Sequence, residues 1–179
     1  TRYNKWSATE RASLFETLAF VPAQPMLVAG TMPKLCSPVE GGIAQKLMAQ
    51  KAQLYHFYGS HRSGRIFYSR KVGYFLQVLD FEPEVLDGRG QRRPPSEFKD
   101  LIFGDPRHAK LALCCLNANL CYWFITVFSD CRHVNKREVD AFPIHLARLA
   151  DCSAAKRLIE LASRLMIDLQ QNSERRSMR

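Results

Sequence analysis

The chain has 179 residues, of which 46% are hydrophobic and 11% aromatic, so it can bury the core of one ordinary folded unit. Its longest apolar stretch, 109–128, is interrupted by Lys110, Asn117 and Asn119 and falls short of the roughly 20 apolar residues that span a bilayer. We therefore expect no membrane partner, and the formal net charge of +9 favours a polyanionic one.

The first residue is Thr1 and no cleavable signal peptide follows it, so we expect the chain to be a piece of a longer protein. The six cysteines fall mostly inside apolar, helix-like segments, where a free Cys behaves as a small buried hydrophobe. This pattern favours a reducing cytoplasm over a disulfide framework. The cysteines are Cys36, Cys114, Cys115, Cys121, Cys131 and Cys152.

The first third of the chain predicts two helices. Residues 8–17 form a short amphipathic pattern, and residues 18–21 then look extended. Ser37 can cap a second helix, with Pro38 in its first turn and Glu40 completing a capping box. This helix is predicted to run to about residue 58, although Gly41 and Gly42 weaken its first turns and allow a later start.

The middle third predicts strands. Residues 65–81 are rich in β-branched and aromatic side chains and are broken at 71–73, which indicates a hairpin. Residues 87–95 contain paired glycines and prolines and are predicted to form a long exposed loop. One further strand is expected over 98–103.

The last third is helical. Asp105 and Pro106 predict the start of a helix that runs to residue 116, and Asn117 or Asn119 begins another that runs to 128. Asn135 and Glu138 start a short helix that ends before Pro143. A heptad-like apolar stripe over 155–169 predicts a final amphipathic helix, with a polar end from residue 174 that frays.

These elements predict an α+β fold with a small, mostly antiparallel sheet, packed helices and a C-terminal amphipathic helix. We expect one domain over residues 1–150. Residues 151–179 then form a helix that packs on this domain or on a partner.

Three segments are rich in Arg and Lys. Residues 58–74 mix basic with aromatic side chains, which can clamp phosphates, read guanine edges or stack on an unpaired base. Residues 89–93 lie on the predicted loop, and residues 132–137 lie at a loop-to-helix junction whose N–H groups can bind phosphate. Each segment could instead be a solvated surface, with Asn135 only a helix cap. The candidate DNA-contacting residues are Arg62, Arg65, Tyr68, Arg70, Lys71, Arg89, Arg92, Arg93, Arg132, His133, Asn135, Lys136 and Arg137.

Catalytic patterns are weak. The cysteines include no Cys-x-x-Cys pair, which argues against structural zinc, and the histidines have no Ser or Cys partner at motif spacing. Asp87 with Glu97 and Lys99 crudely imitates the metal-binding arrangement of a nuclease. However, Asp87 belongs to a Gly-rich loop and Glu97 precedes its strand, so we expect no metal site.

Two stretches carry a resemblance to a known family. The first is LNANLCYWF at 116–124, followed by SDCRHVNKREVDAFPI at 129–144; the second is IFYSR at 66–70, followed by GYF at 73–75. They resemble the C-terminal specificity region of TaqI-like adenine-specific DNA methyltransferases, found in type II restriction-modification and phage-defence systems. Ala118 stands where that family commonly has Ser, and the second Arg and Gly of its hairpin motif are replaced.

The resemblance covers most of residues 33–144. It implies an α+β target-recognition domain that grips duplex DNA opposite a catalytic domain and helps to present an adenine flipped from the stack. In this interpretation Tyr68 stacks or wedges, and four arginines contact bases or phosphates: Arg62, Arg65, Arg70 and Arg132. The residues that mainly anchor phosphate are Lys71, Arg92, Arg93, Lys136 and Arg137.

The chain itself contains neither an Asn- or Asp-Pro-Pro-aromatic motif nor a Gly-rich loop for S-adenosylmethionine. The resemblance therefore implies that catalysis and S-adenosylmethionine belong to a catalytic domain elsewhere in the parent protein. Two alternatives remain open: half of a separate type I-like specificity subunit, and a protein-interaction module whose charge serves only solubility. A metal-dependent nuclease ranks third.

Overall fold

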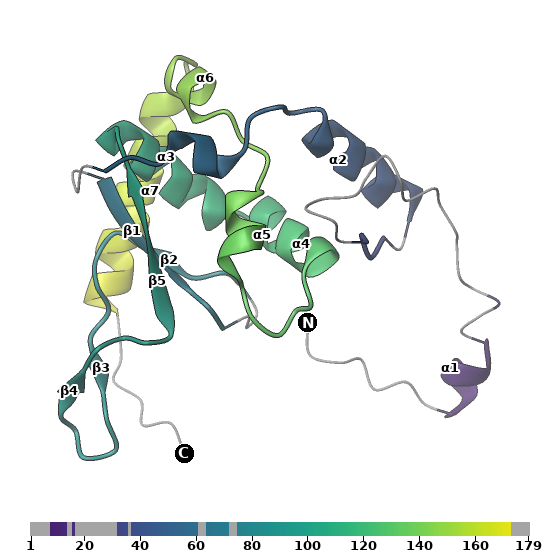
Figure 1. The fold of residues 1–179 in the computed structure, drawn as a ribbon, viewed down its shortest axis with the longest axis horizontal. Helices are drawn as coiled ribbons and strands as arrows, with labels where there is room; N and C mark the ends of the chain where they lie inside the picture. Colours follow the sequence, from purple (N-terminus) through teal and green to yellow (C-terminus); the bar gives the residue numbers. More distant parts are fainter. Residues whose placement is uncertain are drawn as a thin grey trace.

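The computed structural model of the chain describes residues 8–13, 16, 32–35, 37–60, 64–71 and 75–172. The architecture is α+β, as predicted, with a three-stranded sheet, a projecting two-stranded arm and helices packed on one face of the sheet (Figure 1). In chain order the elements are α1 (Ala8–Ser13), α2 (Pro38–Met48), the 3-10 helix η2 (Leu54–Phe57), β1 (Gly64–Ser69), β2 (Val78–Leu79), β3 (Val85–Leu86), β4 (Arg92–Arg93), β5 (Phe98–Phe103), α3 (Pro106–Leu116), α4 (Asn119–Phe128), α5 (Lys136–Asp140), α6 (Leu146–Ala150) and α7 (Ala155–Gln171).

The three-stranded sheet has the order β2-β1-β5, and both strand pairs are antiparallel. β1 pairs along its whole length with β5, from Gly64 opposite Phe103 to Ser69 opposite Phe98. The predicted hairpin over 65–81 is confirmed by the pairing of β1 with β2, in which Phe67 lies opposite Leu79. The expected turn at 71–73 lies partly outside the described residues.

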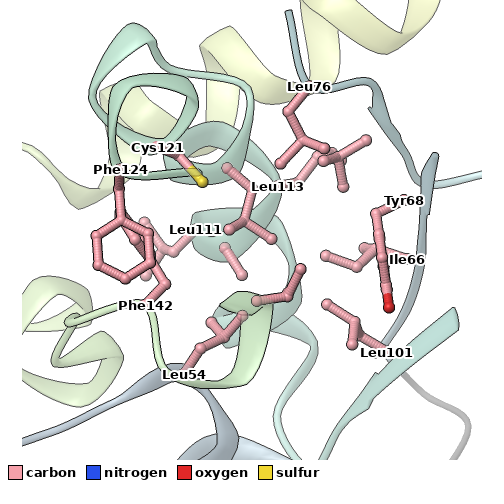
Figure 2. Packing of buried hydrophobic residues seen from close by; sticks show 14 of the residues in the cluster. Leu54, Ile66, Tyr68, Leu76, Leu101, Leu111, Leu113, Cys121, Phe124 and Phe142 are labelled. Carbon is pink, nitrogen blue, oxygen red and sulfur yellow. The ribbon is translucent and has the colours of Figure 1, made fainter. Parts of the chain in front are cut away.

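The core lies between the sheet and α3. Figure 2 shows Ile66 and Leu101 pointing from the sheet toward α3, while Phe124 and Phe142 pack on the far side of that helix. All four side chains are buried, and each such burial contributes roughly 1.5–3 kcal/mol. The sheet is therefore held on one face by a continuous apolar layer, which leaves its other face and its ends for polar groups.

Several helix boundaries follow the sequence signals closely. α3 begins at Pro106, where the Asp105 carboxylate accepts a hydrogen bond from the Arg107 backbone N–H at 2.7 Å. At the start of α2, the Ser37 hydroxyl accepts from the Glu40 N–H at 3.3 Å. α4 begins at Asn119, and α5 and α7 lie where they were expected. Short-range caps fix the starts of α2 and α3, which is why sequence alone locates them.

Two expectations about the elements were wrong, and one helix was not expected. α2 ends at Met48 rather than near residue 58, because the following chain pairs with a distant segment: the Leu54 N–H donates to the Phe142 carbonyl at 3.0 Å, and the Ile144 N–H to the Ala52 carbonyl at 3.0 Å. The predicted loop over 87–95 is not wholly irregular, because it includes β4, which pairs with β3 directly before the loop. α6 was not predicted, since five residues carry too little periodicity.

The first helix is described only over Ala8–Ser13. The predicted continuation to residue 17, the extended segment 18–21 and the fraying end from residue 174 all lie outside the described residues.

α7 packs against α3. Its core-facing residues Ala155, Ala162 and Met166 are buried. Leu161 and Leu165, one turn apart, are 41% and 36% exposed. The apolar face of α7 is thus wider than the surface that α3 covers.

Across the residues that the structure describes, we find no single helix with the length and apolar character needed to cross a membrane. Among these residues, only α3 and α4 taken together have that length and apolar character, and the two helices are bent by 71° at the break between them.

Candidate nucleic-acid interface

Two basic segments whose contacting residues lie 62 positions apart in sequence meet at one end of the sheet. Directly after β1, the Arg70 carbonyl accepts a hydrogen bond from the Val134 N–H at 2.8 Å, and Lys71 forms an isolated antiparallel bridge with His133. The Arg70 N–H donates to the Glu97 carbonyl at 2.8 Å, on the same side of the strand. Along β1, the neighbour on this side is β5. Just beyond the end of β1, the neighbour on the same side is the segment around His133.

The loop that delivers Arg132 and His133 is tightly wound. The Asp130 carboxylate accepts from the Arg132 and His133 backbone N–H groups, at 2.9 and 3.3 Å. These two bonds are the main reason that the pKa of Asp130 is lowered from its usual range. Cys131 has a φ of 58°, a left-handed conformation that a non-glycine residue rarely adopts. The loop is therefore held by the Asp130 carboxylate, and the Arg132 and His133 side chains remain in solvent.

We call Arg70, Lys71, Arg132 and His133 the basic edge. Lys71, Arg132 and His133 are exposed, and Arg70 is half-buried. Within the described part of the chain, no carboxylate forms an ion pair with any of the four. The positive charges of Arg70, Lys71 and Arg132 are therefore available to a ligand.

Lys34 lies close to this edge from a third part of the chain. Its Nζ donates to the Ser129 carbonyl and lies 3.2 Å from the Cys131 Sγ, while its backbone N–H donates to the Val127 carbonyl at 2.9 Å. These contacts tie residues 32–35 to the loop after α4. Lys34 thus supports the base of the loop that presents Arg132.

The second predicted segment lies on the arm formed by β3 and β4, which joins the sheet at Glu97. The Arg93 guanidinium holds the Glu97 carboxylate with two hydrogen bonds, at 2.6 and 3.1 Å. This pairing is the largest cause that lowers the pKa of Glu97 to about 2. Because Arg70 bonds to the Glu97 carbonyl, the base of the arm lies beside the basic edge.

Lys136 and Arg137 lie next along the chain, but each is paired. The Lys136 Nζ donates to both Asp140 oxygens, at 2.8 and 2.7 Å, and lies 4.7 Å from the centre of the Tyr58 ring. The Tyr58 hydroxyl donates to the same carboxylate at 2.7 Å. Arg137 pairs with Glu138 at 3.0 Å. These two cations therefore contribute less free charge than the basic edge does.

Glu138 is buried, with 4% of its surface exposed. One carboxylate oxygen pairs with Arg137, and the other, Oε2, has no hydrogen-bond partner among the described residues. A buried acceptor without a donor costs free energy.

Tyr68 does not suit the wedge or stacking role that the resemblance implied. Its side chain is 1% exposed and points from β1 into the core (Figure 2). Burial, followed by the nearby Asp140 carboxylate, raises the pKa of Tyr68 to about 12. The phenol therefore stays protonated and presents no ring face to a base.

Arg65 lies on the opposite face of the sheet from Tyr68, because successive strand side chains alternate. Its guanidinium pairs with Asp100 at 3.1 Å and lies 4.7 Å from the centre of the Phe67 ring. The same face carries a cavity of about 160 Å³ that these residues line together with Pro95 and Phe98. The predicted cluster of Arg65 with Arg70 is therefore divided between two surfaces.

The remaining candidates give less information. Arg62 lies outside the described residues. Asn135 precedes α5 without a side-chain capping bond, and α5 has only five residues. A helix this short offers a weak dipole, so we do not count its amino end as a phosphate site.

Sequence analysis missed Lys99 as a DNA-contacting candidate. Lys99 is exposed and lies opposite Tyr68 in the β1–β5 pairing, so its side chain leaves the sheet on the same face as Tyr68. The alternation of polar and apolar residues along 98–103 was the sequence signal that could have identified Lys99 as exposed. Lys99 is a further cation near the end of the sheet where β5 begins.

The described residues offer little for catalysis. No group of three or more His, Cys, Asp or Glu side chains among them is arranged to hold a metal ion. Asp87 and Glu97, the nuclease-like pair, are engaged by the arm's own backbone and by Arg93. Burial raises the pKa of the Cys115 thiol to about 12 and also raises that of Cys121, so neither thiol is an activated nucleophile.

Comparisons of the chain with protein-family models, with curated proteins and with solved structures found no match. The interpretation of the site therefore depends on the geometry and on the sequence patterns given above.

Proposed function

We propose that this chain recognises specific sequences in duplex DNA as the non-catalytic specificity part of an adenine-specific DNA methyltransferase in a restriction-modification system. One observation carries the DNA-binding part of this proposal. The fold gathers Lys71, His133 and the base of the Arg93 arm at one end of the sheet, although they come from three separate segments. Lys71 and the neighbouring Arg132 have no ion pair among the described residues, and clustered cations of this kind gain binding free energy by releasing counterions from DNA.

The methyltransferase part of the proposal is supported by the resemblance of residues 66–75 and 116–144 to the TaqI-like specificity region. In this mechanism the basic edge holds phosphates on either side of the target, which fixes the position of the duplex. Flipping a base costs a few kcal/mol, and firm contacts to the flanking DNA supply part of it. S-adenosylmethionine and the transfer chemistry belong to a catalytic domain of the parent protein.

The proposal is tested by fluorescence anisotropy of the full chain with labelled duplex DNA over a series of salt concentrations. One variant removes two charges from the basic edge, Lys71→Ala with Arg132→Ala. The matched control removes two exposed charges, Arg148→Ala with Lys156→Ala, from α6 and the first turn of α7. α6 lies at the opposite end of the molecule from the arm (Figure 1).

We expect binding that weakens steeply with salt. The basic-edge variant should lower the slope of log affinity against log salt by roughly 2, since each lost phosphate contact removes about 0.9. The control variant should leave the slope unchanged. An equal loss in both variants would move the interface away from the basic edge, and no binding at low salt would contradict DNA recognition.

A protein-interaction module is the second candidate, and the exposed leucines of α7 favour it. Leu161 and Leu165 form an apolar strip that α3 does not cover. A chain that fails to bind DNA but associates through this strip would support that function. The type I-like specificity subunit is excluded if a catalytic domain precedes this region in the same gene.

A further inference from the structure

The arm formed by β3 and β4 is a short two-stranded ribbon that extends beyond the end of the three-stranded sheet (Figure 1). Val85 lies opposite Arg93 and Leu86 opposite Arg92. Residues 87–92 are all exposed. The ribbon thus places a stretch of polar side chains in solvent, beside the basic edge at its base.

The tip of the arm has a fixed backbone. The Asp87 carboxylate accepts hydrogen bonds from the Arg89 and Gln91 N–H groups, at 2.8 and 2.9 Å. The Asp87 N–H donates to the Gln91 carbonyl at 2.8 Å, and Gly90 has a φ of 77°, which suits a glycine. A tip held in this way presents its side chains without first having to order its backbone.

The charges of the arm are divided between its base and its tip. Arg92 pairs with Glu84 at 3.0 Å and Arg93 with Glu97 at 2.6 Å, so both cations near the base are compensated. Among the described residues, neither the Arg89 guanidinium nor the Gln91 amide has a side-chain partner. The arm therefore uses its paired arginines to hold its own shape and keeps two hydrogen-bonding side chains free at the tip.

These two residue types match the major groove. Arg forms paired hydrogen bonds with guanine, and Gln does so with adenine. A two-stranded β-ribbon fits the width of this groove. The two residue steps from Arg93 to Gln91 span about 7 Å at ~3.3 Å each, and the turn at residues 88–90 lies beyond them, so the arm with its side chains is long enough for a groove roughly 8.5 Å deep. The tip can therefore reach base edges while the base of the arm remains at the phosphates.

We propose that the arm enters the major groove of duplex DNA and that Arg89 and Gln91 determine its sequence preference. This inference rests on the proposed DNA-binding function. It adds a division of labour in which the basic edge holds phosphates with little regard to sequence, while the tip of the arm distinguishes base pairs.

The test starts from a library of duplexes with a randomised centre, from which the full chain selects bound sequences. The same selection is repeated with Arg89→Lys and with Gln91→Ala. Arg89→Lys keeps the charge but removes the planar fork that pairs with guanine. The control is Arg92→Lys, on the same ribbon but in an ion pair with Glu84. Circular dichroism checks that all the variants fold.

We expect Arg89→Lys and Gln91→Ala each to weaken binding to the selected sequence by roughly tenfold or more, and to lose the preference at one base pair. Binding to unrelated duplexes should change less than about twofold, since phosphate contacts carry it. Arg92→Lys should keep the original preference.

Two outcomes overturn the inference alone: DNA binding without any sequence preference, and a preference that both tip variants retain in full. Complete absence of DNA binding by the unaltered chain overturns the proposed function, and the inference with it. The two failures are therefore distinguishable.

Discussion

The outer face of the sheet and the basic edge carry the same kinds of side chain in different electrostatic settings. On the outer face, Arg65 pairs with Asp100 and lies against the Phe67 ring. At the basic edge, Lys71 and Arg132 face solvent with no described carboxylate in an ion pair with them. Charge alone does not separate the two regions. The position of acidic residues relative to the strands decides which cations can bind an anion.

This difference matters because an ion-paired arginine must give up its partner before it binds phosphate. An exposed pair contributes little to stability, roughly 0–1 kcal/mol, but it lowers the local positive potential. The basic edge needs no such exchange. DNA binding is therefore expected to depend on where charge is removed rather than on how much.

The largest expected effect comes from reversing charge on the two regions separately. Lys71→Glu with Arg132→Glu should weaken duplex binding at low salt by about 100-fold, because two attractive contacts become repulsive. Arg65→Glu with Arg107→Glu changes the net charge equally but acts on cations that are paired with Asp100 and Asp105. We expect that variant to lose less than about tenfold. Anisotropy titrations at one salt concentration measure both, and similar losses would erase the distinction between the regions.

Part of this comparison was predictable from sequence. The basic segments themselves were found, and so were strand 98–103 and the helix from Pro106 to Leu116, because caps and residue composition are local signals. The alternation along β1 also carried the information that Arg65 and Tyr68 leave the sheet on opposite faces. A strict count of that alternation would have predicted the burial of Tyr68.

The remaining features depend on contacts between distant segments. The bridge between Lys71 and His133 and the pairing of Arg65 with Asp100 require the register of chains that lie 62 and 35 residues apart. The early end of α2 likewise reflects pairing with residues 142–144. The arm was missed because each of its strands has two residues, too few for any period to appear.

The next prediction concerns the hydrogen bonds around Asp140, which keep Lys136 in an ion pair. Tyr58→Phe removes the 2.7 Å hydrogen bond from the hydroxyl to Asp140. Because this bond is half-buried and involves a charged acceptor, we expect the free energy of unfolding to fall by roughly 1–3 kcal/mol. DNA binding should stay unchanged, since the Lys136 pair remains. Urea titration measures the stability, and an unchanged midpoint would contradict this role.

A smaller effect is expected when a paired cation is released. Asp140→Asn leaves an oxygen that can accept from Tyr58 but removes the carboxylate charge that holds Lys136. Lys136 then becomes available to phosphate, so the slope of log affinity against log salt should increase in magnitude by about 0.9. Lys136→Ala in the same background should cancel the gain. A slope that does not respond to Asp140→Asn would place Lys136 away from the DNA.

The smallest effect concerns the base of the arm and depends on pH. The Arg93 guanidinium is the main cause that lowers the pKa of Glu97 to about 2, from an ordinary value of 4.5. A carboxylate whose folded pKa is lowered stabilises the fold above the unfolded value, and this contribution is lost as pH falls from 4.5 toward 2. Both groups are largely solvated, so the change in overall stability should be slight.

The sensitive measurement is the titration of the Glu97 side chain by NMR. We expect its midpoint near the lowered value in the unaltered chain and a return toward 4.5 in Arg93→Ala. Arg92→Ala is the matched control, since it removes a neighbouring charge but leaves the Glu97 pair in place. If Glu97 titrates near its ordinary value in the unaltered chain, Arg93 is not held at the base of the arm and belongs with the free cations of the basic edge.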